Sequence, residues 1–152
     1  MVNLLRTYYK TIHPFKKIYW YITRPHLRGA ICVVECNGKF LLVRHDYGHK
    51  LWTFFGGRVN RDEEPEAAAI REAKEEVGIV LRSVTKIGEY ESNVDYKQDH
   101  IDVFYAQVSE PFYVLNPVEL REVNWFAPRE LPRDRSPRVD QVFDMLRNHD
   151  RN

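Results

Sequence analysis

Three glutamates, Glu72, Glu75 and Glu76, stand close together in the middle of the chain. At about 100° per residue of α-helix, they fall on one helical face that is roughly 100° wide. Like charges four residues apart destabilise an isolated helix by a few tenths of a kcal/mol. Convergent carboxylates are, however, the oxygen donors that Mg²⁺ and Mn²⁺ prefer. The spacing therefore predicts a divalent-metal site, with a solvated acidic face as the alternative interpretation.

A pair of glycines, Gly56 and Gly57, precedes this segment. Backbone without a Cβ atom can approach an ion and an anion closely. Magnesium in proteins usually keeps several waters and is shared with the phosphates of a substrate. The glycines and the glutamates together indicate metal-assisted chemistry on a phosphate compound.

The glutamates need a helix to bring them onto one face. Pro65 suits the first turn of such a helix, and Gly78 is typical of the residue that ends one. We therefore predict a helix from Glu64 to about Val77. Its apolar face would carry Ala69, Ile70, Ala73 and Val77.

Other local signals predict the elements around this helix. Asn37-Gly38 between two β-rich runs indicates a hairpin with a type I′ turn. Ser136 and Pro137 are favoured at the start of a helix, which predicts a last helix from Ser136 to about Asn148. Further strands are predicted over residues 84–91, 101–108 and 122–127, and two helical pieces over residues 3–23. This pattern is typical of a mixed α/β domain.

Composition restricts the class of protein. The 152 residues are 43% hydrophobic and 30% charged, which is typical of one globular domain. No apolar run is long enough for a membrane span or a signal peptide, so we expect a cytoplasmic protein. Cys32 and Cys36 would lie roughly 13 Å apart on a strand. That is too far for a disulfide, and we expect two buried thiols.

The sequence around the glutamates resembles the Nudix box, GX5EX7REUXEEXGU, in which U is a bulky aliphatic residue. Gly57 is followed after five residues by Glu63, and after seven more by the stretch Arg71–Ile79. Every fixed position is occupied, and Ala73 at the first U is a mild departure. Seven fixed identities would arise by chance at about 10⁻⁸ per starting position. The resemblance extends over residues 28–131.

This resemblance implies the Nudix α/β/α sandwich, a mixed β-sheet between helices, over residues 28–152. Residues 1–27 would be an extra basic, aromatic helical segment. The resemblance also implies Mg²⁺-dependent hydrolysis, with Mn²⁺ as a substitute, of a diphosphate linkage in a nucleoside diphosphate joined to another moiety X. The metal would neutralise charge and lower the pKa of the attacking water. A non-catalytic nucleotide sensor is the alternative, and we expect no DNA-binding domain.

The resemblance also implies roles for single residues. Glu63 and Arg71 would form a pair that orients the metal-binding carboxylates. The general base would be a box glutamate, Glu72 or Glu75, in our preferred interpretation. The expected metal ligands are the Gly56 carbonyl and the carboxylates of Glu72, Glu75 and Glu76. Three acids outside the box stay open as alternative bases: Asp99, Glu110 and Glu119.

Side chains near the box are candidates for contact with a nucleotide. Trp52 and Phe54 could stack on a base, although aromatic residues on a strand are more typical of a core. Arg44 and Arg58 could bind phosphates. Tyr96 follows the box at a spacing that resembles the dinucleoside polyphosphate hydrolases. Phe55, Asn60 and Asp62 differ from residues common in the family, which bears on loop shape and substrate class.

The N-terminal segment differs in charge from the rest of the chain. Residues 1–34 contain six basic residues and no acidic residue, whereas the whole chain has a formal net charge of +1. We expect the aromatic face of this segment to pack on the sheet or on a second subunit, the latter giving a homodimer. There are two alternatives: the segment contacts an anionic membrane surface peripherally, or it binds a phosphate-rich substrate.

Overall fold

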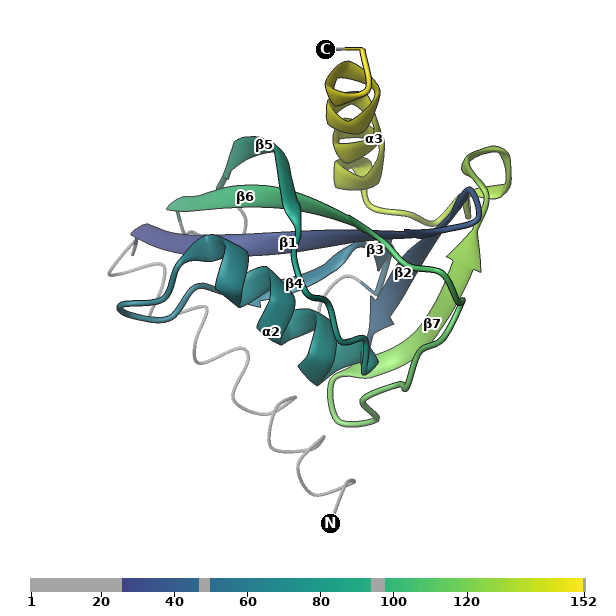
Figure 1. Ribbon diagram of the computed structural model, residues 1–152, viewed down its shortest axis with the longest axis horizontal. Helices are drawn as coiled ribbons and strands as arrows, with labels where there is room; N and C mark the ends of the chain where they lie inside the picture. The colour runs from purple at the N-terminus through teal and green to yellow at the C-terminus, as the bar shows by residue number, and fades with distance from the viewer. Residues whose placement is uncertain (1–25, 47–49, 94–97, 152) are drawn as a thin grey trace.

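The structure, a computed structural model, describes residues 26–46, 50–93 and 98–151. The helical pieces predicted over residues 3–23 and the candidate Tyr96 lie outside these residues. The predicted domain boundary at residues 27 and 28 lies near the start of the first described segment and stays a prediction. Within the described residues, a mixed β-sheet lies between two α-helices (Figure 1). This arrangement confirms the α/β/α sandwich.

A long hairpin forms the centre of the sheet. Strand β1 spans His26–Cys36 and β2 spans Lys39–His45. Asn37 and Gly38 between them have φ values of 50° and 76°. Positive φ at both central residues is what the predicted type I′ turn requires.

The remaining strands join this hairpin on both sides. Strand order is β3-β2-β1-β6-β5, with β4 also paired to β1 and β7 also paired to β2. The pair β1–β6 is parallel and runs from His26↔Gln98 to Glu35↔Gln107, which explains why β6 begins three residues before the predicted start. The other pairs of strands are antiparallel. The strands are β3 Trp52–Thr53, β4 Phe55–Arg58, β5 Thr85–Ser92, β6 Gln98–Gln107 and β7 Leu120–Phe126.

The two helices cover opposite faces of the sheet (Figure 1). Helix α2 spans Pro65–Val77 and α3 spans Pro137–His149, close to the predicted bounds, and a short 3-10 helix, η2, spans Pro128–Glu130. Each helix has its own core. Ala69, Ala73 and Val77 of α2 pack with Phe55 and Leu41 of the sheet. Val139, Val142 and Leu146 of α3 pack with Val33 and Trp52 on the other face.

The ends of α2 fix where its glutamates stand. Gly78 has a φ of 68° and donates its N–H to the Lys74 carbonyl (3.2 Å), while the Ile79 N–H bonds the Ala73 carbonyl (3.0 Å). This is an αL C-cap, for which glycine is favoured because it adopts positive φ without strain. The helix therefore ends directly after the acidic turn.

Two further predictions concern the sheet and the membrane. Cys32 and Cys36 are free and buried, as predicted, and burial raises the pKa of the Cys32 thiol to about 12. Among the described residues, no helix is long and apolar enough to cross a membrane.

Candidate active site

A cleft of about 610 Å³ lies beside the glutamate face of α2. It is formed where four segments that are distant in sequence meet. Its walls come from the end of β2, from β4, from α2 and from the segment before β7. The lining residues are His45, Gly56, Gly57, Arg58, Glu72, Glu75, Glu76, Asn116 and Glu119.

Gly56 and Gly57 allow α2 and β1 to approach β4 closely. A Cβ atom on Gly57 would lie 2.2 Å from Oε1 of Glu72. A Cβ atom on Gly56, whose φ is 153°, would lie 2.2 Å from the Ala30 carbonyl oxygen. Both distances are far below van der Waals contact, so a larger residue would displace the neighbouring carboxylate or strand. Gly57 thus places bare backbone against the Glu72 carboxylate, and Gly56 places it against β1.

Arg71 connects the loop before α2 to two of the glutamates. Its guanidinium contacts both oxygens of Glu63, with Nε–Oε1 at 2.9 Å and Nη2–Oε2 at 3.1 Å. Its Nη1 contacts Glu72 at 2.7 Å and Glu75 at 3.2 Å, and Nη2 donates to the Arg58 carbonyl at 3.0 Å. The hydrogen bonds from Arg71 lower the pKa of Glu63. The planar guanidinium therefore orients the box carboxylates from one side.

Glu76 stands out because its carboxyl group is buried among other acidic side chains. The side chain is 4% exposed, and its Oε2 has no hydrogen-bond partner among the described residues. Burial and the charges of Glu72, Glu119 and Glu75 raise its pKa well above the ordinary value. A buried, unpartnered carboxylate beside like charges is costly unless a cation joins it. Its oxygen-donor neighbours fit a hard divalent cation.

Glu119 brings a fourth carboxylate to the cleft from outside the box. It is half-buried, and burial together with the charges of Glu72 and Glu75 raises its pKa. Of the other two acids proposed as bases, Asp99 lines a smaller hollow of about 240 Å³ that shares Gly56, Gly57 and Arg58 with the cleft. Glu110 lies in a separate depression beyond the end of α2. The structure therefore brings Glu119, but not Glu110, to the glutamates.

Three of the substrate candidates do not lie in the cleft. Trp52 and Phe54 are 6% and 4% exposed and pack in the core under α3. Arg44 stacks on the Trp52 ring (4.9 Å) and pairs with Asp134 at 2.5 Å and Glu122 at 3.6 Å. Base stacking and phosphate binding do not fit these placements, because the side chains already serve the fold. Arg58, by contrast, lines the cleft and is exposed.

Two cleft residues were not singled out from the sequence. His45, at the end of β2, is half-buried, and burial lowers the pKa of its ring. Asn116 lies 40 positions after Glu76 but bonds to its backbone. Neither residue belongs to a motif, so only the packing of β2 and of the segment before β7 reveals them.

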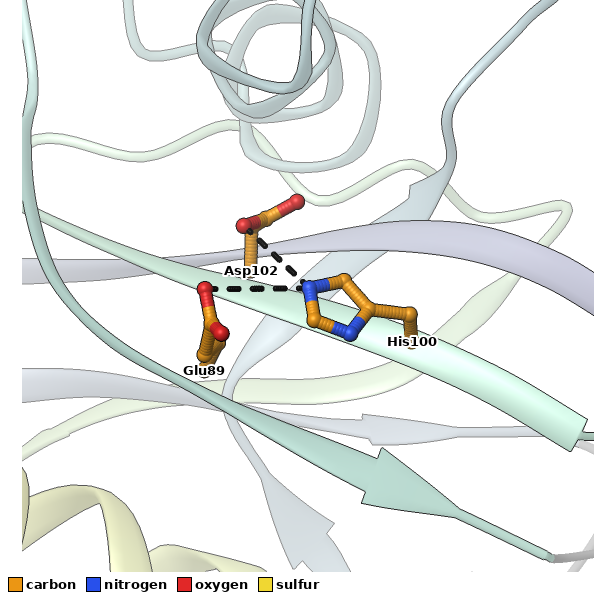
Figure 2. A group of neighbouring side chains, drawn as sticks. All are labelled: Glu89, His100 and Asp102. Carbon is orange, nitrogen blue, oxygen red and sulfur yellow. Dashed lines mark ion pairs between the residues drawn. The ribbon is translucent and has the colours of Figure 1, made fainter.

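A second group of metal-ligand types lies on β5 and β6. Figure 2 shows Glu89, His100 and Asp102 pointing toward one another, with His100 Nε2 at 3.7 Å from each carboxylate. By ligand type the group could hold a metal ion. However, Lys86 pairs with Glu89 and lies 2.6 Å from Asp102, whose other oxygen is 3.1 Å from Arg28 Nε. Protein cations already balance these acids.

Comparisons with known proteins agree with this geometry. The family model described as NUDIX domain matches residues 25–146. The mRNA-decapping enzyme subunit 2 of Arabidopsis thaliana is 34% identical over 127 residues, which is 81% of this chain; the chain spans about a third (34%) of that protein's length. A putative 8-oxo-dGTP diphosphatase of Bacillus subtilis is 28% identical over 107 residues, 70% of each chain.

A solved structure shows the same fold. The MutT NUDIX hydrolase from Burkholderia pseudomallei superimposes with a TM-score of 0.73 at 21% identity, over 80% of this chain and 98% of that one. The matched family model covers the sheet, α2, most of α3 and the cleft. From the box, the sandwich and these matches, we conclude that the chain belongs to the Nudix family of hydrolases.

Proposed function

We propose that this protein is a Mg²⁺-dependent nucleotide pyrophosphohydrolase. Its substrate would be a nucleoside diphosphate joined to a moiety X, cleaved at the diphosphate linkage. The observation that carries this proposal is Glu76, a buried carboxylate without a partner among the described residues, surrounded by Glu72, Glu75 and Glu119. Such a site is stable when a divalent cation neutralises it, and Mg²⁺ is commonly shared with substrate phosphates.

The carboxylates of Glu72, Glu75 and Glu76, with the Gly56 carbonyl, would hold the metal. When bound, the metal would neutralise phosphate charge and lower the pKa of a water molecule. Arg71 keeps Glu72 and Glu75 in place and is itself fixed by Glu63. Mn²⁺, which accepts the same oxygen donors, should replace Mg²⁺.

The reaction needs a water nucleophile and a group that takes its proton. The water oxygen attacks one phosphorus, and the anhydride P–O bond breaks, so that each product carries a phosphate terminus. Glu72 and Glu75 both bond Arg71, whereas Glu119 faces them from another segment. We therefore place Glu119 first as the general base, with Glu75 as the alternative within the box. Arg58, exposed at the cleft, would contact the phosphates.

The names of the relatives suggest two classes of substrate. One relative is named for mRNA decapping and another for 8-oxo-dGTP. The test is release of phosphate products with Mg²⁺ over capped RNA fragments, oxidised and normal dNTPs, ADP-ribose, nucleotide sugars and dinucleoside polyphosphates. We expect turnover of one class, lost in Glu75→Gln and Glu76→Gln.

The same assay separates hydrolysis from the alternative of a nucleotide sensor. Glu66→Gln is the matched control, because Glu66 lies on the same helix but is exposed and outside the cleft. Tight binding of one nucleotide without turnover of any compound would contradict the proposal and favour the sensor.

A further inference from the structure

The segment between β6 and β7 is bonded to the last turn of α2 (Figure 1). The Val114 N–H donates to the Val77 carbonyl at 2.8 Å, and the Asn116 N–H donates to the Glu76 carbonyl at 3.1 Å. The Asn116 side-chain amide, through Nδ2, donates to the Glu75 carbonyl at 3.3 Å. Carbonyls in the last turn of a helix have no intrahelical donor. The segment therefore completes the end of α2 that carries two of the cleft carboxylates.

Asn116 also shapes the turn that leads to Glu119. Its Oδ1 accepts the Val118 N–H at 3.1 Å, and its own carbonyl accepts the Leu120 N–H at 3.0 Å. These bonds enclose Glu119 on both sides along the chain. One asparagine thus connects the two separate sources of carboxylates in the cleft, α2 and the segment before β7.

We propose that Asn116 is a positioning residue that sets where Glu119 stands relative to Glu75 and Glu76. The inference rests on the proposed hydrolase function. Asn116 carries no charge, and its hydrogen bonds go to backbone atoms, so it acts through the carboxylates on either side of it. A displacement of about 1 Å in a catalytic group can cost ~100-fold in rate. Loss of the hydrogen bonds by which Asn116 connects α2 to the turn before Glu119 is therefore sufficient to affect turnover.

The test uses Asn116→Ser in the full chain. A serine hydroxyl can still accept the Val118 N–H and keep the local turn, but it has no amide to donate to the Glu75 carbonyl. Asn124→Ser is the matched control, because Oδ1 of Asn124 likewise accepts a backbone N–H, that of Trp125 at 2.8 Å, on β7 outside the cleft. We expect kcat of Asn116→Ser to fall about 10- to 100-fold, with KM changed less than about threefold.

A readout without substrate separates positioning from general stability. We expect Asn116→Ser to weaken Mn²⁺ binding about tenfold in a metal titration, as loss of a group that orients metal ligands does. Asn124→Ser should leave Mn²⁺ affinity unchanged. A lower Tm with unchanged Mn²⁺ affinity and unchanged kcat would overturn the proposal.

A double-mutant cycle tests whether Asn116 acts through Glu119. In the Glu119→Gln background, Asn116→Ser should reduce kcat by less than about twofold further, because the two residues belong to one unit. Losses that multiply fully, or a Glu119→Gln variant with wild-type kcat, overturn the inference. If the wild-type chain turns over no substrate, the proposed function fails, whereas the Mn²⁺ titration still decides for or against the positioning role of Asn116.

Discussion

Two groups of acidic side chains on this protein look alike by residue type and differ in what balances them. In the cleft, Glu76 has an oxygen without a partner among the described residues, and Arg71 reaches only the glutamates around it. On β5 and β6, Asp102 is equally buried, yet Lys86 and Arg28 bond both of its oxygens. The two groups therefore differ in charge balance: we propose a divalent cation beside the unpartnered oxygen of Glu76, whereas Lys86 and Arg28 already balance Asp102. The four predictions below test this difference.

The largest effect is expected for Glu76→Gln. The substitution removes a buried carboxylate oxygen that has no partner among the described residues. If Glu76 is the proposed metal ligand, kcat with Mg²⁺ should fall at least ~100-fold. Steady-state hydrolysis and a Mn²⁺ titration measure this. Glu66→Gln on the same helix should behave as wild type, and an active Glu76→Gln enzyme would show that the metal sits elsewhere.

A smaller loss is expected for Arg71→Lys. Lysine keeps the charge but cannot contact Glu63, Glu72 and Glu75 with one planar fork. We expect kcat to fall about 10- to 100-fold, with Mg²⁺ needed at higher concentration. Arg82→Lys, at an exposed position past the helix, is the control. Equal activity of the two variants would mean that Arg71 does not orient the carboxylates.

Glu76 and Asp102 should also affect the stability of the folded protein with opposite dependence on pH. The native pKa of Glu76 is raised from 4.5 by burial and then by Glu72, Glu119 and Glu75, so the folded protein binds this proton more tightly than the unfolded chain. Its contribution therefore becomes destabilising as pH rises above 4.5 toward the native pKa, and saturating Mg²⁺ should remove that loss. Tm measured over about pH 3–8, with and without Mg²⁺, tests this.

For Asp102 the sign is reversed. Burial opposes ionisation, but the hydrogen bonds and charges of Lys86 and Arg28 outweigh it and lower the pKa from 3.8. Its stabilisation is therefore present above 3.8 and is lost as pH falls through the native pKa. Mg²⁺ should not alter this part of the curve. If Mg²⁺ did change the loss of Tm at low pH, and Asp102→Asn abolished that change, the cation would bind at Asp102 and not at the cleft glutamates.

The smallest effect on turnover is expected for Asp102→Asn itself. The substitution weakens bonds to Lys86 and Arg28, so the free energy of unfolding should fall by about 1–3 kcal/mol. Turnover should change less than about twofold, because the network lies outside the cleft. Denaturant unfolding and kinetics on one preparation give both values. A loss of activity as large as that of Arg71→Lys would show that Asp102 and its ion pairs contribute to turnover, contrary to this prediction.

Local signals were sufficient for the central hairpin and for both helices. The turn at Asn37-Gly38, the proline at the start of α2 and Gly78 at its end each specify a backbone conformation over a few residues. Their structures could therefore be predicted without knowledge of the rest of the chain. The same holds for the Ser136 cap of α3, whose Oγ accepts the Arg138 N–H at 3.3 Å.

What escaped prediction depends on which strands become neighbours. The alternation along β3 and β4 sends Phe55 under α2 but Trp52 and Phe54 under α3, and nothing within that stretch says which face meets the cleft. Because β7 pairs with β2, Asn116 enters the cleft, and Glu119 is the one of the three open acids that lies beside the glutamates. Such long-range pairing is set by the whole sheet, and a single sequence read segment by segment does not contain it.

The contact between Gly57 and Glu72 has an evolutionary consequence. One added methyl group at position 57 would occupy the space of the Glu72 carboxylate, because the new Cβ would lie 2.2 Å from its Oε1. Such a change would leave the hairpin and both helical cores in place and would displace a carboxylate that we propose as a metal ligand. If the proposed function holds, a single alanine at position 57 separates a hydrolase from a folded protein that only binds its ligand.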